Sequence, residues 1–119
     1  MSETATIQTQ FKNEPAILAA AAEMELPAPV RGTVDLYQTK GHSGLILKFP
    51  GWRYPVVIDT TTGSAAMDTY NGKWGYPQDL QRFTQLYGFH AAKALALRQG
   101  KTVTRKVKPD GTLQLVVNC

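Results

Sequence analysis

The chain has 119 residues, of which 43% are hydrophobic, and its 13 lysines and arginines exceed its 9 aspartates and glutamates to give a net charge of +4. This length suits one domain, residues 1–119, whose core buries roughly two-thirds of the unfolded surface. The single cysteine, Cys119, excludes an intrachain disulfide and a multi-cysteine metal site. No apolar run approaches the ~20 residues that cross a bilayer, and the first ten residues lack the features of a leader peptide. We therefore expect a cytoplasmic or plastid-stromal protein, frayed only at residues 1–4, with no membrane partner.

The first quarter of the chain predicts one strand followed by one helix. Residues 7–11 alternate apolar and polar side chains, which is the period of a half-buried strand. Asn13 is a favourable N-cap, and Pro15 suits a first helical turn, whose N–H groups have no partner within the helix. Pro27 and Pro29 end the helix, because a residue before proline avoids the helical conformation. The apolar stripe of this helix consists of Ile17, Leu18, Ala21 and Met24.

The middle of the chain predicts an antiparallel meander. Four short apolar segments, at residues 33–39, 44–49, 55–59 and 65–70, are separated by turns rich in glycine or threonine. The connections are too short to hold crossover helices, so neighbouring strands must be antiparallel. Residues 60–63 are expected to form a hairpin loop in which Gly63 adopts positive φ.

The last third of the chain predicts a long helix and then a hairpin. Residues 78–99 carry apolar side chains at spacings of three and four, at Leu80, Phe83, Tyr87, His90, Ala94 and Leu97. Gly100 supplies a left-handed C-cap. Strands at residues 102–108 and 112–117 flank a turn at residues 109–111, and we expect this hairpin to rejoin the sheet.

The resulting order is strand, helix, four strands, helix and two strands. It predicts an α+β domain of two layers, in which a mainly antiparallel sheet carries both helices on one face. If no element covers the opposite face, that face is expected to be polar or to bind a partner.

Scattered positions along most of the chain resemble a known family of small proteins. They are residues 68–75, Phe83, Tyr87, His90, Gly100, Asp110, Gly111, Leu113 and Leu115, together with residues 6–9 and Leu18 near the start. The pattern is similar to the family of hypothetical chloroplast reading frame thirty-five, found in plastids, cyanobacteria, other bacteria and some phages. The chain departs from it at residues 68–75, where members often have an Asp-Trp-Trp-Gly-like run, and at Leu26-Pro27, where they often have Leu-Gly. Because the family has no established activity, the resemblance implies a compact intracellular domain and no catalytic residues.

Positive charge is concentrated in the last third. Residues 81–108 contain seven lysines and arginines and no aspartate or glutamate. Two interpretations are open: a solvated strand face that protects a sheet edge, or a surface for an anionic partner. The residues predicted to contact such a partner are Arg98, Lys101, Arg105, Lys106 and Lys108.

Aromatic and cationic side chains are interleaved in two loops that flank the meander. Such side chains stack on bases or anchor a protein partner, but aromatic rings in loops also act as lids that close a core. The predicted binding residues are Trp52, Arg53, Tyr54, Tyr70, Lys73 and Trp74.

No catalytic or metal-binding pattern accompanies these surfaces. Ser43 beside His42 lacks the spacing of a nucleophile elbow, and the two histidines, His42 and His90, have no further ligand at a metal-binding spacing. We therefore predict no cofactor and no metal.

The leading hypothesis is a non-enzymatic module that docks on an anionic macromolecule, either an acidic protein or a nucleic acid. A phage-borne copy that binds a host protein would be one form of it. The alternative is a small enzyme in which His90 meets an aspartate in a pocket near the start of the second helix. The sequence does not indicate the oligomeric state.

Overall fold

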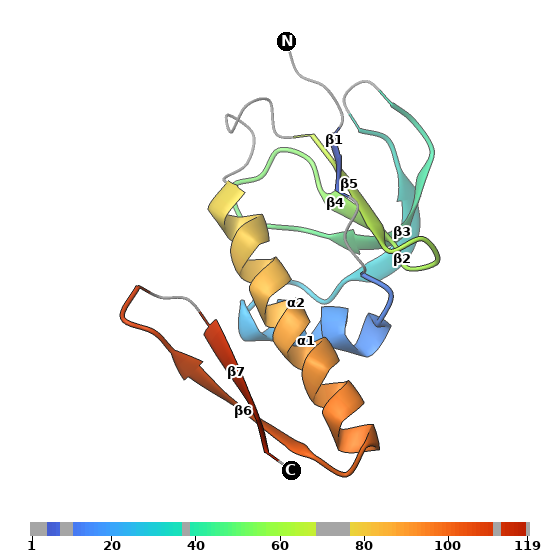
Figure 1. Cartoon of the computed structure of the whole chain (residues 1–119). Coiled ribbons are helices and arrows are strands. Elements are labelled where there is room, and N and C mark those ends of the chain that lie inside the picture. The colour runs from blue at the N-terminus through green and yellow to red at the C-terminus, as the bar shows by residue number, and fades with distance from the viewer. Residues whose placement is uncertain (1–4, 8–10, 37–38, 69–76, 111–112, 119) are drawn as a thin grey trace.

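The computed structural model describes residues 5–7, 11–36, 39–68, 77–110 and 113–118. These residues form an α+β fold with a mainly antiparallel sheet, and the predicted order of elements is confirmed (Figure 1). Residues 1–4, which were expected to fray, lie outside the described residues, as does part of the first predicted strand. The elements are β1 (Ala5–Ile7), α1 (Glu14–Glu23), β2 (Val30–Val34), β3 (His42–Leu47), β4 (Val56–Asp59), β5 (Ser64–Met67), α2 (Pro77–Arg98), β6 (Thr102–Val107) and β7 (Leu113–Asn118).

Helix α1 begins where the sequence predicts. The Asn13 side chain accepts a hydrogen bond from the Ala16 N–H at 3.1 Å, as an N-cap does. The hydroxyl of Tyr87 accepts two more, from the N–H groups of Lys12 and Asn13 at 3.1 and 3.2 Å. Because Tyr87 belongs to α2, these bonds fix the start of α1 against the second helix.

Strands β1 to β5 form one antiparallel sheet in the order β1-β5-β4-β3-β2. The meander prediction is confirmed, although β2 begins at Val30 and β3 at His42, each before the predicted start. The loop between β4 and β5 is closed by a 2.7 Å hydrogen bond from the Gly63 N–H to the Asp59 carbonyl, with Gly63 at φ 82°. That positive φ is a conformation that glycine adopts readily.

Both helices cover one face of this sheet, and the core lies between the helices and the sheet. Alternate residues of the central strands, such as Leu45, Leu47, Val56 and Ile58, are buried in a single cluster with side chains of α1 and α2. Aromatic rings occupy the middle of this core, where the rings of Phe11 and Tyr87 meet edge to face at 4.9 Å and Phe11 and Phe83 lie 5.8 Å apart. Such pairs stabilise a core beyond the burial of their area.

Two residues predicted to face the core are exposed. The buried stripe of α1 consists of Ala16, Ile17, Ala20 and Ala21. Leu18 points away from this stripe and is 39% exposed. Leu97 is 55% exposed. The 22 residues of α2 extend over about 33 Å, so its last turns project beyond the sheet.

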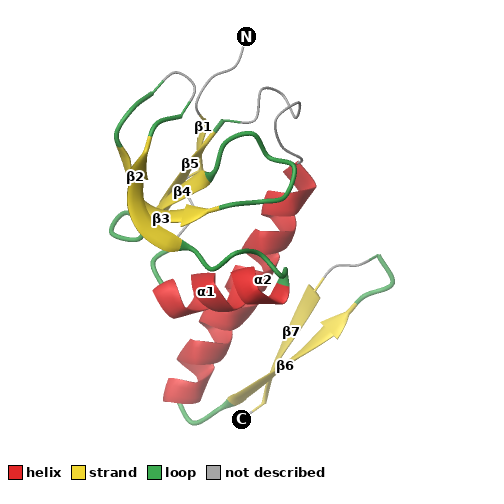
Figure 2. Ribbon diagram, turned by 180° about the vertical axis from the view of Figure 1, so that it is seen from behind, coloured by secondary structure: helices red, strands yellow, loops and turns green. Residues whose placement is uncertain are grey.

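The C-terminal hairpin does not rejoin the main sheet, contrary to the expectation from the sequence. Strands β6 and β7 form a separate two-stranded sheet that lies alongside α2, away from the five-stranded sheet (Figure 2). Helix α2 ends at Arg98, Gly100 follows it with φ 74°, and the Lys101 N–H donates to the Ala96 carbonyl at 2.9 Å. A link this short reverses the chain at the projecting end of α2, so the hairpin packs on that helix.

The packing of the sheet can be tested at Gly44. A Cβ there would lie 2.2 Å from the carbonyl oxygen of Ile58, so we expect Gly44→Ala to lower the free energy of unfolding by about 2–4 kcal/mol. Gly88→Ala is the control, because a Cβ at this position in α2 meets open space and alanine favours a helix by about 0.5–1 kcal/mol. Urea unfolding of both variants measures the difference. Equal effects would contradict the close approach of β3 and β4.

Candidate functional site

The two faces of the hairpin have different surroundings. The pairing register places Val103, Arg105 and Val107 of β6 on one face, and Thr102, Thr104 and Lys106 on the other. Val103 is buried in a small cluster with Phe89 and Ala96 of α2. The face that includes Val103 is therefore the inner face of the hairpin, and Lys106 belongs to the outer face.

Arg105, predicted to contact an external anion, pairs with a carboxylate of the protein itself while its side chain stays partly exposed. Its guanidinium lies on the inner face, where it forms two hydrogen bonds to the carboxylate of Glu23, one of them 3.0 Å long. The same guanidinium lies over the ring of Phe89, 4.7 Å from its centroid. Arg105 thus joins β6 to α1 and α2.

Glu23 also accepts a hydrogen bond from His90 of α2, at 2.6 Å between Oε2 and Nε2. The hydrogen bond from Arg105 holds the pKa of the Glu23 carboxyl down at about 2; burial opposes this shift, while the bond from His90 and both positive charges add to it. Glu23 in turn raises the pKa of Arg105. Because an ionised carboxylate only accepts hydrogen bonds, Nε2 of His90 carries a proton.

Sequence analysis did not identify Glu23 as a functional residue. It lies in the last turn of α1, 67 residues from His90 and 82 from Arg105. No local pattern connects residues so far apart. An unpaired glutamate at the C-terminal end of a helix is unfavourable, because the helix dipole is negative there. This unfavourable interaction with the helix dipole was the one feature of the sequence that could indicate a cationic partner for Glu23.

The surroundings of His90 differ from those of the enzymatic alternative. Its acidic partner is a glutamate, it lies beyond the middle of α2, and its ring packs edge to face on Phe89 at 5.2 Å. Among the described residues, no group of three or more histidine, cysteine, aspartate or glutamate side chains could hold a metal ion. The hydrogen bonds that Glu23 accepts from His90 and Arg105 join α1 to α2 and β6.

The other predicted cations are available at the surface. Arg98, Lys106 and Lys108 are exposed and Lys101 is half-buried. In the described part of the chain, the ion pairs are Glu14 with Arg31 and Glu23 with both His90 and Arg105, so these four cations belong to none of them. They extend from the last turn of α2 to the end of β6.

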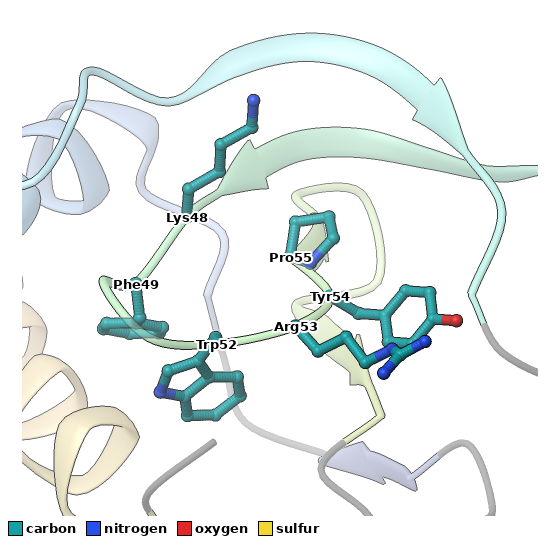
Figure 3. A pocket seen from close by; sticks show the side chains of 6 residues that line it. All are labelled: Lys48, Phe49, Trp52, Arg53, Tyr54 and Pro55. Carbon is teal, nitrogen blue, oxygen red and sulfur yellow. The ribbon is translucent and has the colours of Figure 1, made fainter. Parts of the chain in front are cut away.

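The first aromatic loop encloses a hollow of about 210 Å³, lined by Lys48, Phe49, Trp52, Arg53, Tyr54 and Pro55 (Figure 3). Trp52 lies against Phe49, with ring centroids 4.9 Å apart, and donates a 2.8 Å hydrogen bond to Asp79 at the start of α2. This geometry is that of a lid on the core. The guanidinium of Arg53 lies 6.0 Å from the ring centroid of Tyr54, and the two side chains lie next to each other further along the loop (Figure 3).

The predicted binding residues of the second aromatic loop, Tyr70, Lys73 and Trp74, lie outside the described residues. The structure therefore assembles the cationic residues around the hairpin and α2, and places the described aromatic residues in a separate loop next to the start of α2.

Comparisons with known proteins give no counterpart, since no protein-family model, curated protein or solved structure matches the chain. The resemblance to the chloroplast reading frame family stays a prediction. The fold and the site define a small α+β domain with a cationic hairpin. No helix among the described residues has the length and apolar character to cross a membrane.

The Glu23 cluster predicts a specific dependence of stability on pH. Because the folded-state pKa of about 2 lies below the ordinary 4.5, ionised Glu23 stabilises the fold fully above about pH 4.5, and this contribution is lost as the pH falls toward 2. We expect Glu23→Gln to lower the free energy of unfolding by about 1 kcal/mol at neutral pH. The effect is small because the ion pairs of Glu23 with His90 and Arg105, here called the Glu23 bridge, are partly open to water. The difference from the native protein should shrink in acid.

Urea unfolding at neutral pH and at about pH 3 tests this expectation. Glu25→Gln is a suitable control, because Glu25 is exposed and forms no ion pair among the described residues. A pH-independent effect of Glu23→Gln, or an equal effect of Glu25→Gln, would show that the bridge does not stabilise the protein.

Proposed function

We propose that this protein is a non-enzymatic binding module that docks on an anionic macromolecule through its C-terminal hairpin. The observation that supports this most directly is the state of the hairpin cations. Arg105 is neutralised by Glu23, whereas Lys106 and Lys108 are exposed and belong to no ion pair within the described residues. Their charge remains available to a partner.

The distribution of charge along the chain strengthens the proposal. A net charge of +4 is distributed so that residues 81–108 carry seven cations and no acid. Clustered cations of one sign attract an anionic partner from a distance and increase the rate of association, an effect that salt screens. A stretch that served solubility alone would gain as much from mixed charges.

Attachment to the body of the protein makes the hairpin a defined surface. An isolated two-stranded hairpin is marginally stable in water and gains stability by packing on a helix. Here Val103 is buried against α2 and Arg105 is bonded to α1. The lysines of the outer face are thereby presented on a fixed ribbon, which limits the entropy lost on binding.

The enzymatic alternative receives no comparable support. It requires His90 to meet an aspartate in a pocket, but His90 donates to Glu23 and lies away from the start of α2. The hollow beside that helix is lined by Lys48, Phe49 and residues 52–55 of the aromatic loop.

The proposal predicts salt-dependent binding to polyanions that requires the outer lysines. The double variant Lys106→Glu, Lys108→Glu should elute from immobilised heparin at lower salt than the native protein. The slope of log affinity against log salt concentration should decrease in magnitude by about two, one for each cation removed. Fluorescence titration with labelled oligonucleotide and with poly-glutamate measures the same quantity in solution.

A matched control separates the hairpin from net charge. The double variant Lys12→Glu, Lys40→Glu changes the charge equally at exposed positions outside the hairpin. The proposal requires that it retain most of the native affinity. Identical losses in the two double variants, or no binding of the native protein to any polyanion at low salt, would refute the hairpin as the docking surface.

A further inference from the structure

Strand β2 forms an open edge of the five-stranded sheet (Figure 2). It pairs with β3 on one side, from Val30 opposite Ile46 to Val34 opposite His42. On its other side, no strand or backbone hydrogen bond joins it to any residue that the structure describes. Alternate residues of an edge strand point their N–H and C=O groups away from the sheet, and these groups pair with another extended chain. The backbone chemistry of this edge therefore calls for a β-strand.

Strand β2 lacks the features by which proteins protect a sheet edge. Such features are short length, a bulge, proline, lysine or an uncompensated charge. β1, at the opposite edge, pairs with its neighbour at three positions, whereas β2 pairs at five consecutive positions without a bulge. The sequence of β2, Val-Arg-Gly-Thr-Val, contains neither proline nor lysine. Its one charged residue, Arg31, forms an ion pair with Glu14 of its own chain, so the edge carries little net charge.

The two faces of β2 carry different side chains. Arg31 and Thr33 lie on the face that the helices cover, as the bond from Arg31 to Glu14 of α1 shows. Val30, Gly32 and Val34 lie on the opposite face. Val30 is 60% exposed there, so an apolar side chain stands in water beside the open edge.

We infer that two copies of this protein form a symmetric dimer in which β2 of one copy pairs antiparallel with β2 of the second copy. The two-fold axis passes next to Gly32, the middle residue of β2, because this register pairs every residue of the strand. The axis is perpendicular to the sheet, so the two sheets become one and the helices of both copies cover the same face. This inference is independent of the proposed function, since the hairpin belongs to the other sheet.

The side chains of β2 are complementary to themselves in this register. Arg31 lies opposite Thr33 of the second copy, so no like charges are directly opposite each other. Val30 lies opposite Val34 of the second copy, and this apolar pair covers part of the surface that Val30 exposes in a single chain. A shift of the axis to Arg31 would place two arginines opposite each other. A second copy centred on Gly32 therefore satisfies both the backbone groups and the side chains of the edge.

Opposite charges introduced at Thr33 test this register, because Thr33 is exposed and lies opposite Arg31 of the second copy. Thr33→Lys creates two like-charge pairs in the dimer and should raise its Kd about fivefold, whereas Thr33→Glu creates two opposite-charge pairs and should lower it about fivefold. Both variants lose the 2.8 Å hydrogen bond between the hydroxyls of Thr33 and Ser43, so their difference reports the charge. Sedimentation velocity over a series of concentrations measures Kd, which we expect to lie below about 1 mM for the native protein.

Thr104→Lys and Thr104→Glu are the matched controls. Thr104 is also an exposed strand threonine, but it belongs to β6. These substitutions change the net charge by the same amounts and should leave Kd unchanged. Amide hydrogen exchange of the native protein locates the contact without a substitution. Exchange within residues 30–34 should slow as the concentration rises, because outward N–H groups enter the new pairing.

Several results would overturn the inference. One is a native protein that stays monomeric up to about 1 mM. Others are a Kd that responds alike to Thr33→Lys and Thr33→Glu, equal responses to the Thr104 variants, or concentration-dependent protection that lies in β6 and β7 instead of β2. Each of these results would leave the binding of heparin by the hairpin lysines as it is, so the dimer and the proposed function are tested separately.

Discussion

The carboxylate of Glu23 is the charged group through which the C-terminal hairpin is joined to the rest of the protein. It accepts hydrogen bonds from His90 of α2 and from Arg105 of β6, while belonging itself to α1. In isolation, a glutamate in the last turn of α1 would oppose the helix dipole. Its two partners offset that cost, so the three elements stabilise one another. The hairpin also packs on α2 through the cluster of Val103, Phe89 and Ala96.

This arrangement divides the positive charges of the last third into two groups with different roles. Arg105 is fixed by a carboxylate and an aromatic ring, so its charge is paired within the fold. Lys106 is adjacent in sequence but, because successive residues of a strand point to opposite faces, it is exposed. A count of cations treats the two alike. Only the position of α2 beneath one face distinguishes them.

The features that could be predicted from the sequence are those that local chemistry determines. Asn13 caps α1 by its own side chain, and Gly63 and Gly100 adopt positive φ in turns that their neighbours define. The position of the hairpin depends instead on where α2 ends relative to the sheet, and on a bridge between residues 82 positions apart. Neither leaves a local pattern. Because such long-range packing leaves no local pattern, Leu97 was predicted to lie in the core and Glu23 was not recognised.

The distal half of the hairpin carries more apolar character than its own packing uses. The inner face of β6 carries Val103, which α2 buries, then Arg105, and then Val107, which is 69% exposed. A strand selected only for solubility would become polar on both faces beyond the helix, because exposed apolar edges favour unwanted association. A partner that docks on the hairpin, as proposed above, would add the contacts that two strands alone lack and would stabilise the hairpin by mass action. Binding and order of the hairpin would then be thermodynamically linked, with the hydrogen bonds of Glu23 holding the free hairpin in position.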